Sequence, residues 1–99
     1  MSRLEAKFTA SFGSDLKRMA KRKNRNLVEL EKVLELVLEN SQKSLNELRQ
    51  RHRMHTLSGK WAGRKECHVA NMGDWLLIWS TDERFAYFER TGTHDELFR

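Results

Sequence analysis

Four histidines give this chain side chains that can move protons near neutral pH. They are His52, His55, His68 and His94. The pKa of an unperturbed imidazole is about 6.5, so one ring can accept a proton while another donates one. Cleavage of RNA without a metal ion needs both functions, because a base activates the ribose 2′-hydroxyl and an acid protonates the leaving oxygen. A single histidine is more often structural, and His52 is interpreted as a solvated residue of a basic loop.

The charge of the chain favours a polyanionic partner. Lysine and arginine number 19 against 14 aspartates and glutamates, a formal net charge of +5, and the pI is about 9.7. Each phosphate that a basic side chain neutralises releases counterions, which stabilises a complex with nucleic acid. A surface that is basic only for solubility would have the same composition, so charge alone does not decide between these interpretations.

The single cysteine, Cys67, excludes an internal disulfide, and its neighbours have the pattern of a strand, so we expect the thiol to pack in the core. Cys67-His68 and His52-x-x-His55 fit no standard zinc spacing, and neither a metal nor a cofactor is predicted. No apolar run at the N-terminus is typical of a signal peptide or a membrane helix. The cytoplasm is therefore the expected compartment, with no membrane partner.

Three tryptophans could stack on the bases of single-stranded RNA. Trp75 and Trp79 lie within an apolar strand pattern, so packing in the core is the favoured interpretation for both. Trp61 lies outside that pattern, and its role stays open between stacking and packing.

Hydrophobic periodicity divides the chain into the elements that must position these residues. Loose alternation of Leu4, Ala6, Phe8 and Ala10 predicts a half-buried strand over residues 3–10. A basic helix capped by Ser11 or Ser14 follows through residue 23, and a second helix covers residues 26–40. Residues 44–53 could add a further helical turn. Strands are predicted over residues 65–69, 75–80 and 85–90, separated by the turn residues Asn71, Gly73, Asp82 and Glu83.

This order predicts an α+β fold: an N-terminal strand, two helices and then an antiparallel strand meander, with the helices packed on one face of the sheet. At 99 residues the chain is expected to form a single domain over residues 1–99. The opposite face of the sheet would then be free for a substrate or partner. His68 would lie near one strand end and His94 just after another, which lets the two converge.

Several blocks of the sequence resemble the YafQ branch of the RelE/ParE toxin superfamily. They are Phe12-Gly-Ser-Asp-Leu-Lys17, His55-Thr-Leu-Ser-Gly-Lys-Trp-Ala-Gly-Arg64, Glu66-Cys-His68, Asp74-Trp-Leu-Leu-Ile78 and Phe88-Glu-Arg-Thr-Gly-Thr-His94. The connection from His68 to Asp74 is two residues longer than is usual in the family. Arg49, His52 and Met54 stand where the family commonly has a proline, a tyrosine and an aspartate.

The resemblance implies a catalytic set of His55, His68, Asp74 and His94. It further implies that Arg90 holds the scissile phosphate and that Phe98 supports the site. His94 is expected to be the general acid and His68 or His55 the base, with Asp74 as orienting group or as the base itself. Arg64 is a candidate for phosphate contact, with a surface or packing role as the alternative.

The function implied is that of a type II toxin, a ribosome-dependent mRNA endoribonuclease. Contact with ribosomal RNA phosphates is expected along the basic helix, from Lys17, Arg18, Lys21 and Arg22. The partners implied are the ribosome, mRNA and a cognate antitoxin that is acidic where it touches the toxin. One alternative is a ParE-like toxin that binds DNA gyrase and needs no set of histidines. Another is an inactive RNA- or antitoxin-binding module, which the longer loop before Asp74 would permit.

Overall fold

Five strands form one mixed sheet in the computed structural model, which describes residues 2–23, 25–70 and 73–98. The strands are β1 (Glu5–Phe8), β2 (His55–Thr56), β3 (Lys65–His68), β4 (Leu76–Thr81) and β5 (Phe85–Gly92). Their order across the sheet is β1-β5-β4-β3-β2. β1 pairs with β5 in parallel, and the other neighbours are antiparallel. The α+β class and the C-terminal meander are thus confirmed.

The helices are α1 (Ala10–Ala20), α2 (Leu27–Glu39), α3 (Gln42–His52) and α4 (His94–Phe98), with a 3₁₀ turn at Gly59–Trp61. α1 begins one residue after Thr9, whose hydroxyl accepts the Phe12 N–H, so the expectation of a serine cap was wrong. α3 is a full helix, not one added turn. Ser41 and Ser44 cap its N-terminus reciprocally, a local signal that supports helix initiation.

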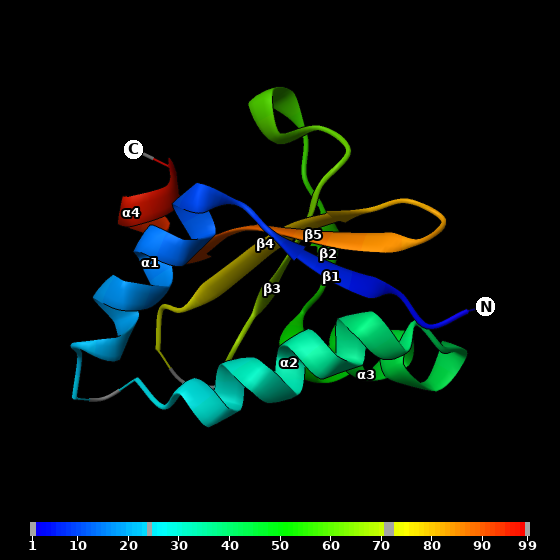
Figure 1. Cartoon of the computed structure of the whole chain (residues 1–99), viewed down its shortest axis with the longest axis horizontal. Coiled ribbons are helices and arrows are strands. Elements are labelled where there is room, and N and C mark those ends of the chain that lie inside the picture. The colour runs from blue at the N-terminus through cyan, green and yellow to red at the C-terminus, as the bar shows by residue number, and fades with distance from the viewer. Residues whose placement is uncertain (1, 24, 71–72, 99) are drawn as a thin grey trace.

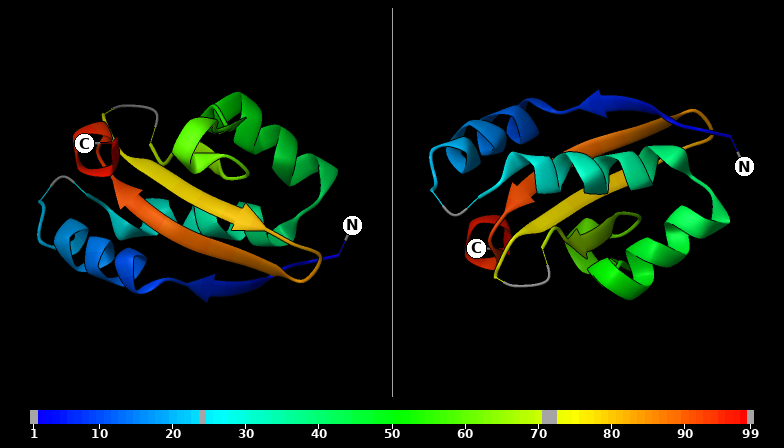
Figure 2. Two further views of the ribbon diagram at one scale, coloured as in Figure 1. Left: turned by 90° about the horizontal axis from the view of Figure 1, so that it is seen from above. Right: turned by 90° about the horizontal axis from the view of Figure 1, so that it is seen from below.

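One face of the sheet is covered by α2 and α3, as the views in Figures 1 and 2 show. The core on this face includes Leu30 and Val33 of α2 and Leu48 of α3, together with Trp79 and Phe88 of the sheet. Cys67 and Trp75 belong to the same cluster. The core roles predicted for Cys67, Trp75 and Trp79 are therefore confirmed.

The opposite face carries a smaller apolar cluster of Leu76, Ile78 and Leu97, against which Leu57 and Trp61 pack. Leu97 lies on α4, so this short helix lies across the sheet from α2 and α3. The expectation that helices leave this face entirely free holds for the longer helices α2 and α3, but not for α4. Most of the remaining side chains on this face are polar, and it carries the candidate site.

β1 is shorter and more exposed than the alternating pattern predicts. All four of its residues are exposed, including Phe8, and the buried Leu4 precedes the strand. β1 is an edge strand that ends where Thr9 caps α1, so its side chains are left largely uncovered. Of the predicted turn residues, Asp82 accepts the Arg84 and Phe85 N–H groups, whereas Asn71 lies outside the described residues. No helix in the described ranges is long and apolar enough to cross a membrane.

Candidate active site

The ladder between β2, β3 and β4 places two of the histidines on one face. His55 of β2 lies opposite Glu66 of β3, and His68 lies opposite Leu76 of β4. Side chains alternate across a strand, so Glu66 and His68 point away from the helix-covered core that receives Cys67. His68, at the end of β3, and His55, on the neighbouring strand β2, thus lie on the same face of the sheet.

His94, the first residue of α4, is held by Asp74. Its Nδ1 lies 2.7 Å from Oδ1 of Asp74, and its backbone N–H donates to the same oxygen at 3.0 Å. Burial alone would raise the pKa of Asp74, but these hydrogen bonds outweigh it and hold the pKa below its usual value. With Nδ1–H donating to a carboxylate, Nε2 of His94 is left for a substrate.

His68 is the half-buried partner of this pair, with its ring centroid 6.1 Å from that of His94. Burial lowers the pKa of His68, and the nearby charges of Arg53, His94 and His55 lower it further against the opposing charge of Glu66. The neutral ring is therefore favoured. Its backbone carbonyl lies 2.8 Å from Nδ1 of His52, the last residue of α3. The interpretation of His52 as a solvated loop residue was wrong.

His55 is more exposed than His68, and each of its ring nitrogens lies near an oxygen that can accept a hydrogen bond. Nδ1 lies 3.0 Å from the Arg53 carbonyl oxygen, and Nε2 lies 3.3 Å from Oε1 of Glu66. Only an imidazolium can donate to both. Glu66 is buried, and its other carboxylate oxygen has no hydrogen-bond partner among the described residues. With protein acceptors beside both ring nitrogens, His55 is less available than His68 to take a proton from a substrate.

Arg90 of β5 is fixed by Asp15 of α1, which the sequence did not single out. Nε and Nη2 of Arg90 donate to the two oxygens of Asp15 at 2.7 and 3.2 Å. The Asp15 carboxylate is only 2% exposed and also accepts from the Thr91 N–H and from Arg18. Burial by itself raises the pKa of Asp15, but these donors outweigh it and keep the carboxyl ionised. Arg90 thus has a defined orientation with Nη1 not engaged by Asp15.

α1 ends at Ala20, so the helix predicted through residue 23 was too long, and Lys21 and Arg22 follow it. Two of the four basic residues expected to contact RNA are paired inside the protein. Arg18 and Arg22 both contact Oε2 of Glu96, at 2.7 and 2.6 Å, which ties α1 to the helix that carries His94. Lys17 and Lys21 are exposed. The sequence could not separate these pairs, because Glu96 lies more than 70 residues away from both arginines in the chain.

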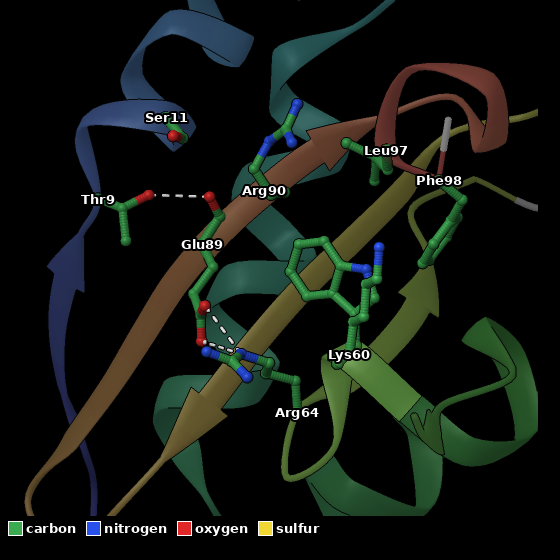
Figure 3. A pocket seen from close by; sticks show the side chains of 9 residues that line it. Thr9, Ser11, Lys60, Arg64, Glu89, Arg90, Leu97 and Phe98 are labelled. Atoms are coloured by element: carbon green, nitrogen blue, oxygen red, sulfur yellow. Dashed lines mark hydrogen bonds and ion pairs between the residues drawn. The ribbon is translucent and has the colours of Figure 1, made fainter. Parts of the chain in front are cut away.

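A pocket of about 730 Å³ lies beside Arg90, between the start of α1, the 3₁₀ turn and α4 (Figure 3). Arg64, Arg90 and Phe98, which were predicted to contact RNA, line this pocket together with Lys60 and Trp61. The Phe98 ring lies 6.2 Å from that of His94 and 6.0 Å from that of Trp61. Lys60 was missed, although its place between Gly59 and Trp61 is a basic and aromatic pattern that could have indicated it.

The described residues contain no group of three or more histidines, cysteines, aspartates and glutamates arranged to hold a metal ion. The site combines the exposed imidazole of His94, which contacts the Asp74 carboxylate, with the half-buried imidazole of His68 and the guanidinium of Arg90. Arg25 adds a contact that the sequence did not reveal, because its guanidinium donates to the Asp74 carbonyl at 3.0 Å and lies over the Trp75 ring. This contact fixes the backbone at the residue that orients His94.

Comparisons with known proteins agree with this architecture. A family model described as "Bacterial toxin of type II toxin-antitoxin system, YafQ" matches residues 4–99. The mRNA interferase toxin YafQ of Escherichia coli strain K12 is 29% identical over 98 residues, which cover 99% of each chain. The crystal structure of YafQ from E. coli strain BL21(DE3) matches with a TM-score of 0.82 and 27% identity, covering 98% of this chain and 100% of that one.

A further match is the crystal structure of the E. coli DinJ-YafQ toxin–antitoxin complex, with a TM-score of 0.79 and 27% identity over 98% of this chain and 99% of that one. The resemblance drawn from the sequence blocks is thereby confirmed, and the relatives' name of mRNA interferase favours the endoribonuclease over the gyrase-binding alternative. The chain belongs to the YafQ family of bacterial toxins of type II toxin–antitoxin systems.

Proposed function

We propose that this mRNA interferase cuts ribosome-bound mRNA in the cytoplasm by metal-independent acid–base catalysis, with His94 as the acid and His68 as the base. One observation carries the proposal: the ring centroids of His68 and His94 lie 6.1 Å apart, and the two rings have contrasting environments. His94 is exposed and held by a carboxylate, whereas His68 is half-buried and favoured as the neutral ring. A phosphodiester between them would meet a donor on one side and an acceptor on the other.

The reaction conserves both protons. Neutral His68 takes the proton of the ribose 2′-hydroxyl, the 2′-oxygen attacks the adjacent phosphorus, and the bond to the 5′-oxygen of the next nucleotide breaks. Protonated His94 gives its proton to that leaving oxygen. The products are a 2′,3′-cyclic phosphate and a 5′-hydroxyl end. Asp74 orients His94 and stabilises its imidazolium form, the role that a carboxylate behind a catalytic histidine performs elsewhere.

Charge on the phosphate is met by Arg90 and His55. Arg90 enters with its orientation already fixed by Asp15, which reduces the reorganisation needed when the phosphorane forms. His55 lies on the same face, with Nε2 3.3 Å from Oε1 of Glu66, and contributes positive charge when its ring is protonated. Arg64 and Phe98 contact the RNA from the adjoining pocket, with Phe98 also packing beside the His94 ring.

The ribosome would be contacted through exposed cations at the end of α1 and just after it. Lys17 and Lys21 are free to meet ribosomal RNA phosphates, whereas Arg18 and Arg22 are engaged by Glu96 and contribute mainly by fixing α4. Such contacts are expected to weaken with added salt, because binding releases counterions.

We further propose a cognate antitoxin as the protein partner. The E. coli relative has been crystallised as a complex with the antitoxin DinJ. A chain with a net charge of +5 is complemented by an acidic partner. By lying over the histidine-bearing face, such a partner would exclude the RNA.

The test is cleavage of a translated mRNA on purified ribosomes, with the cut ends mapped. The wild-type toxin should cut in the presence of EDTA and leave 2′,3′-cyclic phosphate ends. His94→Ala should slow cleavage by about 10²- to 10⁴-fold, the usual contribution of a general acid. Lys43→Ala, a change at an exposed residue of α3, is the control and should cut normally. Near-normal cutting by a folded His94→Ala variant would remove His94 from the mechanism.

A further inference from the structure

The pocket beside Arg90 is also lined by Lys60 and Trp61, to which the proposed function assigns no role. It lies between the start of α1, the 3₁₀ turn and α4, and none of His55, His68 and His94 lines it. Its volume of about 730 Å³ is in the range of small-molecule sites. Because Arg90 forms part of its wall, whatever fills the pocket adjoins the group bound by that guanidinium.

Two aromatic rings form part of the wall of this pocket. Trp61 packs against the cluster that contains Leu76 and Ile78, which holds the indole in place. Phe98 is 42% exposed and meets Trp61 nearly edge-on, with ring planes at 77°. Trp61 is half-buried, and aromatic rings with an accessible surface are the usual platforms on which single-stranded bases stack.

Cations lie at the same rim. Lys60 is exposed and precedes Trp61 on the 3₁₀ turn, and its ammonium has no ion-pair partner among the residues that the structure describes. Arg64 lies over the Trp61 ring with its guanidinium carbon 5.8 Å from the centroid. Glu89 is the one carboxylate lining the pocket, and it is bound by Nε of Arg64 at 3.0 Å and by the Ser80 hydroxyl at 2.8 Å. Its negative charge is thus compensated.

We propose that this pocket is a nucleotide subsite, which binds one residue of single-stranded RNA next to the scissile phosphate. The base stacks on the Trp61 ring and meets the Phe98 ring by its edge, because the two ring planes stand at 77°, and Lys60 holds the phosphate of that nucleotide. The assignment rests on the proposed function only in taking Arg90 as the ligand of the scissile phosphate. Affinity for RNA at this subsite is then separable from cleavage, because the proton-transfer groups lie outside the pocket.

Tryptophan fluorescence tests the subsite directly, because Trp75 and Trp79 are each only 2% exposed. The probe is a 2′-O-methyl RNA hexamer, which the toxin cannot cleave because its 2′-oxygens carry no proton and cannot attack. Titration of the wild-type chain should quench fluorescence in step with binding measured by anisotropy of an end-labelled hexamer. Trp61→Ala should abolish the quenching and weaken binding by about 5- to 150-fold, the equivalent of 1–3 kcal/mol for one stacked base.

Trp61→Phe keeps an aromatic ring and should restore much of the affinity while still removing the quenching. Lys60→Ala changes an exposed side chain and keeps all three tryptophans, so the variant should fold normally. It should bind the hexamer more weakly, and its binding should depend less on salt concentration. The subsite is wrong if the hexamer binds without quenching, or if Trp61→Ala and Lys60→Ala bind as the wild type does. Either result leaves the cleavage test of His94→Ala intact, since the hexamer reports binding alone.

Discussion

The two faces of the sheet differ in the interactions that hold their side chains. The face under α2 and α3 is apolar and closed, with Leu48, Trp79 and Phe88 almost wholly buried. The opposite face carries His68, Arg90 and a small apolar cluster, and its polar groups are held by ion pairs and hydrogen bonds to distant residues. Stability is therefore concentrated on the closed face, while the open face keeps charged groups accessible in fixed orientations. Substitutions on the two faces should separate these contributions.

The largest effect is expected from removing a core ring on the closed face. Phe88→Ala should lower the free energy of unfolding by about 3–5 kcal/mol, because the fully buried ring leaves a cavity between the sheet and its helices. Phe98→Ala is the matched change on the open face. That ring is 42% exposed, so the loss of stability should be much smaller while RNA cleavage falls. Urea denaturation and the cleavage assay, run on both variants, measure the contrast; equal losses of stability would contradict it.

A smaller effect on stability is expected at the ion pair that joins α1 to β5. Asp15→Asn keeps the size of the side chain but removes the charge that binds Arg90 and Arg18, so unfolding should become easier by about 1–3 kcal/mol. Cleavage should fall as well, because Arg90 loses its fixed orientation. Asp82→Asn is the control, since Asp82 also accepts backbone N–H groups but lies in the exposed β4–β5 turn. Unchanged cleavage by folded Asp15→Asn would show that Arg90 needs no such support.

The sequence predicts the closed face better than the open one for a physical reason. The apolar stripe of α2 and the strand pattern around Trp79 are local periodicities, and each must be buried whatever its partner. The partners of polar groups are not local. Asp15 meets Arg90 across 75 positions, and His52 meets the carbonyl of His68 across 16.

The histidine set and Arg90 were named from the resemblance of short blocks, and their roles remain proposals. The residues that hold them in place, Asp15, Arg25, His52 and Glu66, lie outside those assignments because their contribution depends on tertiary contacts. The error at His52 illustrates this. A histidine next to arginines suggests a solvated loop, but the capped helix α3 carries it to the end of β3.

The pH dependence of single-turnover cleavage tests the central claim most directly. Burial lowers the pKa of His68, so the neutral, proton-accepting ring persists to lower pH than a free imidazole would allow. The rate should therefore hold as pH falls through 6.5 and decline only at lower pH, and His68→Gln should remove that decline together with most of the rate. The assignment of His68 as the base would be contradicted if the rate of His68→Gln declined on acidification with the same midpoint as the wild type. It would also be contradicted if the wild-type rate already declined at a pH above 6.5 as the solution is acidified.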